Sequence, residues 1–308
     1  MTPFVTATAN YLATLSFVAR QHLGQHFLAD LEWREQIARA IRVSPHADAP
    51  STTTPPPHAA HCWIEIGPGH GEMTSYLAGA GVPVHAIELD PILLGPLKRL
   101  KKTFPNLDVV HGDILESDLQ TIAVGRRIHV YGSLPYYITS PILHHLFQFA
   151  DSIDEIHVVV QNEVAERLAA KPGSKSYGYL SVATQLYARP ELVFEIPRAA
   201  FQPPPEVGSA LVTLRLPGER ANLRLAEGLP ASEGEPLSEH RDSESAFLEF
   251  VKLCFSQKRK TLVNNLRALA PPERVREKLA ALEIRGDARA EQISIANFAT
   301  LYAALRTR

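Results

Sequence analysis

The feature that most constrains the fold is an alternation of strand-like and helix-like segments in the first half of the chain. Short apolar runs, typical of buried strands, occur at 62–66, 84–88, 107–110, 127–131 and 156–160. Helix-compatible segments lie between them at 72–80, 91–102 and 139–149. This pattern predicts a doubly wound, mostly parallel α/β sheet of the Rossmann-like type. Two later runs, 191–196 and 209–216, are joined without a helix and predict an antiparallel pair that closes the sheet.

The rest of the chain predicts two inserts and a helical tail. Residues 44–60 are rich in Pro, Ala, Ser and Thr, and residues 217–245 carry seven acids against three bases with little to bury. Apolar stripes with helical spacing follow in four groups: Phe247, Phe250, Val251, Cys254 and Phe255; Leu262, Leu266 and Leu269; Val275, Leu279 and Leu282; Phe298, Leu301, Tyr302 and Leu305. We therefore predict a main domain over 1–216 with a Pro-rich insert at about 44–60, an acidic flexible insert over 217–245 and a helical domain over 246–308.

Composition excludes several classes of protein. The chain has 308 residues, 45% of them apolar and 21% charged, which suits a globular protein with a sizeable core. Its two cysteines are far apart, so we expect no disulfide framework. No apolar run approaches the roughly 18 residues of a membrane span, and the first basic residue is Arg20. We expect a cytoplasmic monomer that contacts no membrane.

The clearest local signal is a glycine-rich turn, Glu65–Gly71, between the first strand and the next helix. Its glycines, which let a ligand approach the backbone amides, are Gly67, Gly69 and Gly71. Glu88 ends the next strand, where a carboxylate can accept both ribose hydroxyls, and Asp113 follows the third, where it can accept from an adenine amino group. Together these features predict an adenosine site at the carboxyl edge of the sheet, although the glycine spacing alone leaves a nicotinamide cofactor open.

The fourth strand runs into Gly132-Ser133-Leu134-Pro135-Tyr136-Tyr137, which resembles the N-L-P-Y motif of amino-group methyltransferases. The chain from about residue 20 to 266 resembles the KsgA-type rRNA adenine dimethyltransferases. The matching blocks are Gly24–Asp30, Glu65–Gly71, Ala86–Asp90, Gly112-Asp113, Gln161–Leu168, Pro172–Val182, Phe201–Val207 and Phe255–Asn264. Eight blocks in family order are a far more specific signal than any single motif.

This resemblance implies an S-adenosylmethionine-dependent enzyme that dimethylates the N6 amino groups of two adjacent adenosines in a 3′-terminal hairpin of small-subunit (16S) rRNA, during small-subunit biogenesis. It places catalysis at Ser133, Leu134, Pro135, Tyr136 and Phe201. It places cofactor binding at His26, Leu28, Gly67, Gly69, Gly71, Glu88, Asp113 and Ser133. Ser133 Oγ and a backbone carbonyl in Leu134–Pro135 would accept the amino hydrogens. Tyr136 would stack on the extruded adenine, and Phe201 would cover its other face.

Two positions depart from the family pattern, because His26 and Ser133 stand where asparagine is usual. Because of these departures, an alternative function remains: a ribosome-assembly factor that binds RNA and cofactor but catalyses methyl transfer poorly. A large-subunit rRNA adenine methyltransferase is the other alternative, although the Pro172–Val182 and Phe201–Pro205 blocks favour the small subunit.

The tail predicts the RNA contact. Residues 246–278 carry eight bases against three acids, in a chain with a net charge of -2. We expect a basic helix face with Lys258, Arg259 and Lys260 to bind rRNA phosphates. We expect no metal site, because His58, His61 and Cys62 have no second group of ligands to complete a tetrahedral set.

Overall fold

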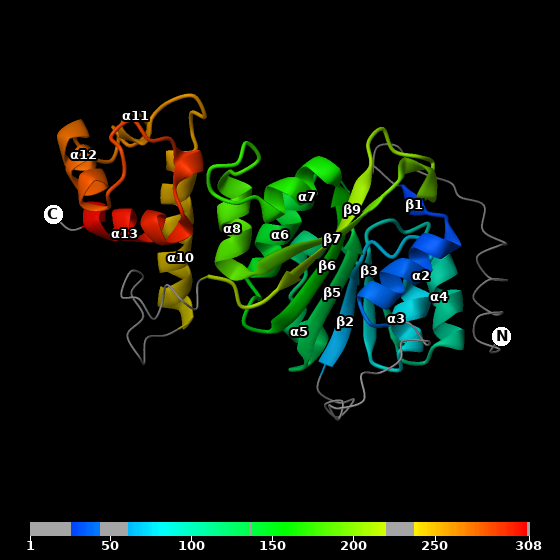
Figure 1. Cartoon of the computed structure of the whole chain (residues 1–308). Coiled ribbons are helices and arrows are strands. Elements are labelled where there is room, and N and C mark those ends of the chain that lie inside the picture. Colours follow the sequence, from blue (N-terminus) through cyan, green and yellow to red (C-terminus); the bar gives the residue numbers. More distant parts are fainter. Residues whose placement is uncertain (1–25, 44–60, 136, 220–236, 307–308) are drawn as a thin grey trace, which may run out of the picture. The chain divides into compact units, whose positions relative to one another are not determined.

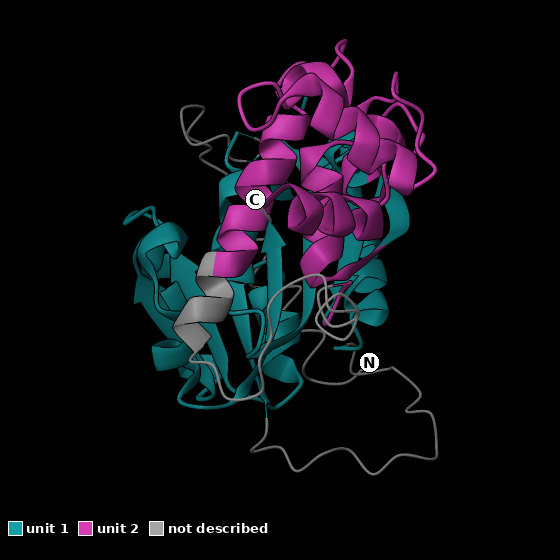
Figure 2. Cartoon of the chain, turned by 90° about the vertical axis from the view of Figure 1, so that its left-hand side faces the viewer, with its two compact units in different colours: residues 1–165, 191–216 teal, residues 166–190, 217–308 magenta. Residues whose placement is uncertain are grey.

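The computed structural model describes residues 26–43, 61–135, 137–219 and 237–306 (Figure 1). The chain forms two compact units, one of residues 1–165 and 191–216 and the other of residues 166–190 and 217–308 (Figure 2). The predicted insert at 44–60 lies outside the described residues. Within the described residues, no helix is long and apolar enough to cross a membrane.

The first unit is built on a seven-stranded sheet in the order β4-β3-β2-β5-β6-β9-β7. The strands are β2 (His61–Ile66), β3 (Val84–Glu88), β4 (Leu107–His111), β5 (Arg127–Ser133), β6 (Ile153–Gln161), β7 (Arg189–Ile196) and β9 (Ser209–Arg215). The first five pair in parallel, whereas β9 runs antiparallel to β6 and lies between β6 and β7. The doubly wound sheet predicted from the alternating runs is therefore confirmed.

Helices cover both faces of this sheet. Figure 1 shows α2 (Leu31–Ala40), α3 (Thr74–Gly79) and α4 (Leu94–Thr103) on one face, with α5 (Leu119–Ala123) and α6 (Thr139–Phe147) on the other. Helix α2 begins at Asp30, whose carboxylate accepts a hydrogen bond from the Glu32 amide at 2.9 Å. Strand order reverses beside β2, where β3 and β5 flank it on opposite sides, and such a switch point leaves a crevice at the carboxyl ends of the strands.

A small second sheet lies next to that crevice. Strands β1 (Phe27–Leu28) and β8 (Phe201–Gln202) pair antiparallel, with Leu28 opposite Phe201. The buried Arg34 of α2 fixes this segment, because its guanidinium donates to the carbonyls of Leu28 at 2.6 Å and Ala29 at 2.8 Å. The pairing was not predicted, since each strand has only two residues and carries no periodic signal.

The second unit is helical. It contains α8 (Tyr179–Tyr187), α10 (Leu237–Cys254), α11 (Leu262–Asn265), α12 (Pro272–Ala281) and α13 (Ile295–Arg306), while α7 (Asn162–Ala169) spans its first boundary. Helix α10 begins inside the segment predicted as an acidic insert. The apolar helical stripe predicted over Leu262, Leu266 and Leu269 is wrong at Leu269, because α11 stops at Asn265 and Leu269 is 50% exposed. The predicted domain boundaries remain predictions.

Candidate functional site

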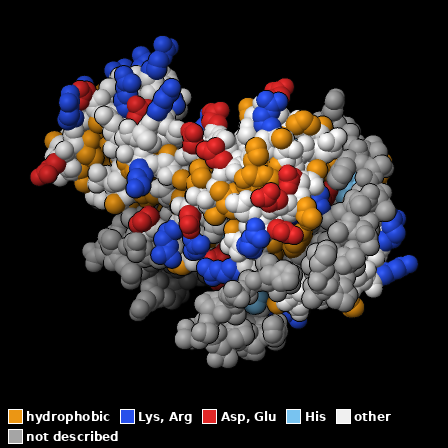
Figure 3. Space-filling model, turned by 45° about the vertical axis from the view of Figure 1, so that its right-hand side comes forward, with side chains coloured by type: hydrophobic (Ala, Val, Ile, Leu, Met, Phe, Trp, Pro, Cys, Tyr) orange, Lys and Arg blue, Asp and Glu red, His pale blue; other side chains and the backbone are white. Residues whose placement is uncertain are grey.

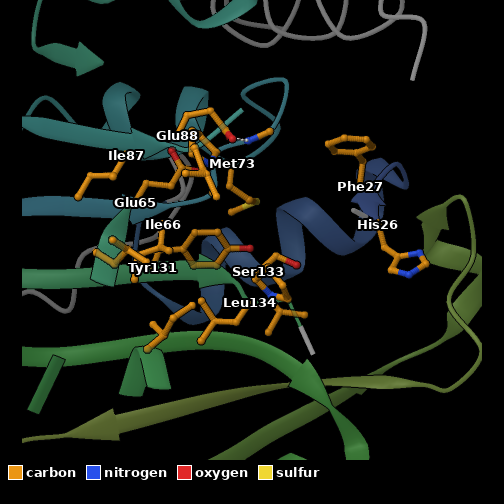
Figure 4. A pocket seen from close by; sticks show the side chains of 18 of the residues that line it. His26, Phe27, Glu65, Ile66, Met73, Ile87, Glu88, Tyr131, Ser133 and Leu134 are labelled. Atoms are coloured by element: carbon orange, nitrogen blue, oxygen red, sulfur yellow. Dashed lines mark hydrogen bonds between the residues drawn. The ribbon is translucent and has the colours of Figure 1, made fainter. Parts of the chain in front are cut away.

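A pocket opens at the carboxyl edge of the sheet, within the first unit, and residues at or just after the ends of β2, β3, β4 and β5 line it (Figure 4). The predicted site residues that line it are His26, Leu28, Gly67, Gly69, Glu88, Asp113, Ser133, Leu134, Pro135 and Phe201. Tyr136 lies outside the described residues. The fold thus brings together side chains as far apart in sequence as His26 and Phe201.

The glycine turn forms one wall of the pocket. Gly67, Gly69 and Gly71 have φ of 64°, 62° and 95°, a region that side-chain-bearing residues rarely adopt. A Cβ on Gly69 would lie 3.0 Å from Glu72 Oε2 and 3.1 Å from the Phe27 ring, so any other residue there would displace these neighbours. Gly71 does not line the pocket; a Cβ there would lie 2.9 Å from the side chain of Leu100. The turn packs closely against α4 at this position, and the cofactor contact of Gly71 stays a prediction.

Glu88 is oriented by backbone amides. Its side chain is 5% exposed, and the Gly69 amide donates to Oε2 at 3.2 Å while the Asp90 amide donates to Oε1 at 2.8 Å. Burial raises the pKa of this carboxyl, and the two amide hydrogen bonds oppose that shift. Each carboxylate oxygen has more than one acceptor site, so Glu88 can still accept from a ligand hydroxyl.

Asp113 also combines a structural contact with exposure to the pocket. Its Oδ1 accepts from the Leu115 amide at 2.9 Å and begins the short 3-10 helix Ile114–Glu116. This contact fixes the side chain at the end of β4, half-buried at the pocket wall. A carboxylate in this position can accept from an exocyclic amine.

The turn after β5 forms the opposite wall. Ser133 ends β5, and the Leu134 amide donates to the Val159 carbonyl at 3.0 Å, which ties the turn to β6. The Pro135 carbonyl accepts from the Ile138 amide at 3.2 Å and from the Thr139 hydroxyl at 3.1 Å. These two bonds start α6 and leave Ser133 and Leu134 facing the pocket (Figure 4).

Strands β1 and β8 bring the remaining predicted residues to the pocket. Phe201 is buried opposite Leu28, and the Phe27 ring meets the imidazole of His70 edge-on at 4.4 Å between centroids. His26 lines the pocket, and its Nδ1 lies 2.9 Å from the Pro203 carbonyl, so this nitrogen is directed at the chain rather than at a ligand.

Sequence reasoning missed Glu65 and Tyr131, which lie under the centre of the pocket. Both are buried, and the hydroxyl end of Tyr131 points toward Ser133 (Figure 4). Burial, reinforced by the nearby charges of Glu72 and Glu88, raises the pKa of Glu65 to about 8. Its Oε2 has no hydrogen-bond partner among the described residues. The available signal was an acid immediately before the glycine turn, inside an otherwise apolar strand.

The predicted basic residues lie in the second unit. Lys258, Arg259 and Lys260 are exposed, but they occupy the turn between α10 and α11, so their assignment to a helix face is wrong. The buried Asn265 explains the turn, because its Nδ2 donates to the Cys254 carbonyl at 2.6 Å and caps the end of α10. The ion pairs of α10 and α12 use Lys252, Arg276 and Lys278, whereas none within the described residues uses the three turn residues.

Comparisons with known proteins agree with this geometry. Residues 16–225 match the family model described as ribosomal RNA adenine dimethylase. The chain is 35% identical over 289 residues to a Ribosomal RNA small subunit methyltransferase A of Xanthomonas euvesicatoria pv. vesicatoria (strain 85-10), covering 94% of this chain and 97% of that protein. The counterpart in Xanthomonas oryzae pv. oryzae (strain PXO99A) shows the same identity and coverage.

Two solved structures share the architecture. The 23S rRNA methyltransferase ErmE matches with a TM-score of 0.62 and 26% identity, over 91% of this chain and 99% of its own. A dimethyladenosine transferase from Plasmodium falciparum matches with a TM-score of 0.68 and 21% identity, over 90% of this chain and 96% of its own, which supports the fold.

Proposed function

Because the chain belongs to the ribosomal RNA adenine dimethylase family, we propose that its pocket dimethylates the N6 amino groups of two adjacent adenosines in a 3′-terminal hairpin of small-subunit rRNA. The chain is an rRNA methyltransferase. The observation that carries the proposal is the convergence of the glycine turn, Glu88 and Ser133-Leu134-Pro135 on one pocket. The small subunit is favoured over the large because the small-subunit relatives match at 35% identity and ErmE at 26%.

We infer that the methyl donor is S-adenosylmethionine, which when bound supplies a methyl group on a positively charged sulfonium. The donor set fits such a ligand. Glu88, fixed by two amides, would accept the ribose hydroxyls, and the turn at Gly67 and Gly69 would let the ligand reach the backbone. The orphaned Oε2 of Glu65 offers a buried acceptor that a cationic ligand would favour in its ionised form.

The turn after β5 would orient the adenine amino group. The lone pair of an exocyclic amine is delocalised into the ring, and acceptors on its two hydrogens localise that pair at nitrogen. Ser133 Oγ is one acceptor. The Pro135 carbonyl already accepts two hydrogen bonds that start α6, so the Leu134 carbonyl is the better second acceptor. Fixing the amine in line with the methyl group supplies the remaining rate enhancement through orientation.

Two aromatic residues would enclose the adenine once it leaves its stack. Phe201 is fixed in the pocket wall by its pairing with Leu28. Tyr136 is assigned the stacking role by its place in the Ser-Leu-Pro-Tyr motif alone. The neighbouring Tyr137 is 61% exposed.

Lys258, Arg259 and Lys260 would bind the rRNA backbone. Acidic and basic side chains are interspersed over the face shown in Figure 3, and the net charge is -2, so attraction to phosphate must be local. The three turn residues are exposed and have no acidic partner among the described residues, which leaves their charge available. Changing all three to Ala should weaken rRNA binding and flatten its salt dependence without altering cofactor affinity. An unchanged salt slope would contradict this contact.

The proposed activity is tested by measuring methyl transfer from labelled S-adenosylmethionine to unmethylated small subunits, large subunits and naked rRNA. We expect transfer to the small subunit, with two methyl groups on each of two adjacent adenosines in the modified nucleotide map. Transfer confined to large subunits would favour the alternative substrate. Binding to small subunits without methyl transfer, restored by Ser133→Asn, would identify an assembly factor instead.

A further inference from the structure

A cluster of two histidines and a glutamate lies on the sheet of the first unit, outside the pocket. His129 belongs to β5, Glu155 and His157 belong to β6, and one ligand atom of each lies within 4.8 Å of the other two. His129 pairs in register with Glu155, and His157 follows Glu155 by two positions. Side chains two positions apart share a face of a strand, so all three project to the same side.

Contacts behind the cluster direct these atoms toward one point. Arg215 Nε donates to Glu155 Oε1 at 3.1 Å, which leaves Oε2 at 3.2 Å from His157 Nε2 and 4.0 Å from His129 Nδ1. The far nitrogens of both histidines also face oxygens. His157 Nδ1 lies 3.0 Å from Thr213 Oγ1, and His129 Nε2 lies 3.9 Å from Asp154 Oδ2. An oxygen at hydrogen-bond distance from the far nitrogen, as Thr213 is for His157, is the usual surrounding of a metal-bound imidazole.

His157 supplies an independent observation. Its side chain is 2% exposed, and its Nε2 has no hydrogen-bond partner among the described residues, although Glu155 Oε2 is close by. The contact becomes an ion pair only when the imidazole carries a proton. When Nδ1 donates to Thr213, two lone pairs face each other at the centre of the cluster, and a cation between them would satisfy both.

We propose that His129, Glu155 and His157 bind a divalent transition metal ion, with Zn²⁺ as the occupant. Two imidazoles and one carboxylate suit zinc and its neighbours rather than Mg²⁺ or Ca²⁺. Two ligand atoms on one tetrahedral zinc lie roughly 3.3 Å apart, given bonds of about 2.0 Å. The 3.2 Å between Glu155 Oε2 and His157 Nε2 meets this requirement, whereas the 4.0 Å between Glu155 Oε2 and His129 Nδ1 is longer, so binding would draw the His129 ring inward.

Such an ion would crosslink two neighbouring strands next to the pocket. Tyr131 and Val159 line the pocket and each lies two positions beyond a proposed ligand, His129 and His157, but none of the three ligands lines the pocket itself. The ion would stabilise the fold, because a ligand that binds only the folded chain shifts the folding equilibrium toward the folded state.

Zinc binding by the full chain tests this proposal. After treatment with a chelator and dialysis, the protein is titrated with Zn²⁺ in a calorimeter, and its thermal unfolding is followed with and without the ion. We expect one tightly bound Zn²⁺ per chain and a higher unfolding temperature in its presence. Replacing His129, the most exposed ligand, by Gln should weaken the binding at least tenfold and abolish the thermal shift.

His85→Gln is the matched control, because His85 is another partly buried strand histidine with a carboxylate oxygen at 3.9 Å, but it lies outside the cluster. This variant should bind Zn²⁺ as the parent does. A parent chain that binds no Zn²⁺ would overturn the proposal without any variant. Equal affinity in the parent and a folded His129→Gln chain would also overturn it, since the ion would then lie elsewhere.

Discussion

The two walls of the pocket are built in different ways. On the cofactor wall, Glu88 is fixed by the amides of Gly69 and Asp90, and Glu72 accepts from the His70 amide at 3.0 Å. On the base wall, Ser133 and Leu134 project from a turn tied to β6, and Phe201 is brought in by the pairing of β1 with β8. The hydrogen bonds that fix the first wall all lie within residues 69–90, whereas the second wall needs segments that lie far apart in sequence.

The difference shows where such a site can tolerate change. A buried carboxylate that accepts two amide bonds cannot be exchanged without leaving those donors unsatisfied, so the cofactor wall has little freedom. Ser133, one of the two departures from the family pattern, lies on the base wall, whereas the other, His26, is at a position predicted to contact the cofactor. Ser133 can replace the usual asparagine because the backbone carbonyls beside it do not depend on the side chain at this position.

The largest effect is expected on the cofactor wall. Glu88→Ala should weaken S-adenosylmethionine binding by about 1.5–3 kcal/mol, because the ribose hydroxyls lose a charge-assisted acceptor and two amides lose their partner. Calorimetry on the folded variant measures the change. Asp108→Ala is a suitable control, since this acid lies on the neighbouring strand β4 and pairs with Lys101 at the surface. Equal affinity in the parent and the Glu88 variant would refute the assignment.

A comparable or smaller effect is expected on the base wall, and on rate rather than on affinity. Ser133→Ala should slow methyl transfer roughly tenfold to a hundredfold, equivalent to about 1.4–2.8 kcal/mol, with cofactor binding unchanged. Ser133→Asn should keep or raise the rate, because a carboxamide oxygen reaches further. Single-turnover rates on unmethylated small subunits decide between the roles. If the Ser133→Ala variant transfers methyl groups as fast as the parent, Ser133 has no part in orienting the adenine amino group, and the backbone carbonyls alone do so.

The smallest effect concerns Glu65, between the two walls. Its pKa in the folded protein is about 8, against an ordinary value of 4.5. The folded chain therefore retains a proton that the unfolded chain releases, and the stability from this group is complete below about pH 4.5 and lost as the pH rises toward 8. Between pH 6 and pH 7, the free energy of unfolding of the parent should fall by on the order of 1 kcal/mol more than that of the Glu65→Gln variant.

Urea unfolding of the parent and the Glu65→Gln variant at both pH values measures this difference, and titrating groups that do not interact with Glu65 cancel in it. Parallel pH profiles for the two proteins would mean that Glu65 is ionised in the folded state. The pocket would then contain a stabilised charge, on Glu65, before any ligand binds.

Local pattern alone was sufficient for much of the fold. The run 84–88 coincides with β3, and 107–110, 127–131 and 156–160 fall within β4, β5 and β6, because buried parallel strands read as short apolar runs between helices. The elements that were missed are short or irregular. Helix α5 has five residues, and β1 and β8 have two each, so the apolar pattern of each element ends before it repeats.

What the sequence by itself determined was the chemistry of the motifs and the order of the strands: Glu88 and Asp113 at strand ends, glycines where φ is positive, and Ser133 before Leu-Pro. Tertiary structure decided which of these groups are free to act. In the folded chain Gly71 packs against Leu100, and the Pro135 carbonyl accepts a hydrogen bond at the start of α6. The basic residues lie in the turn after α10, whose last carbonyl accepts from Asn265. It also brought His129 beside Glu155 and His157. Burial and hydrogen-bond partners depend on segments that meet only in the folded chain, so no local pattern encodes them.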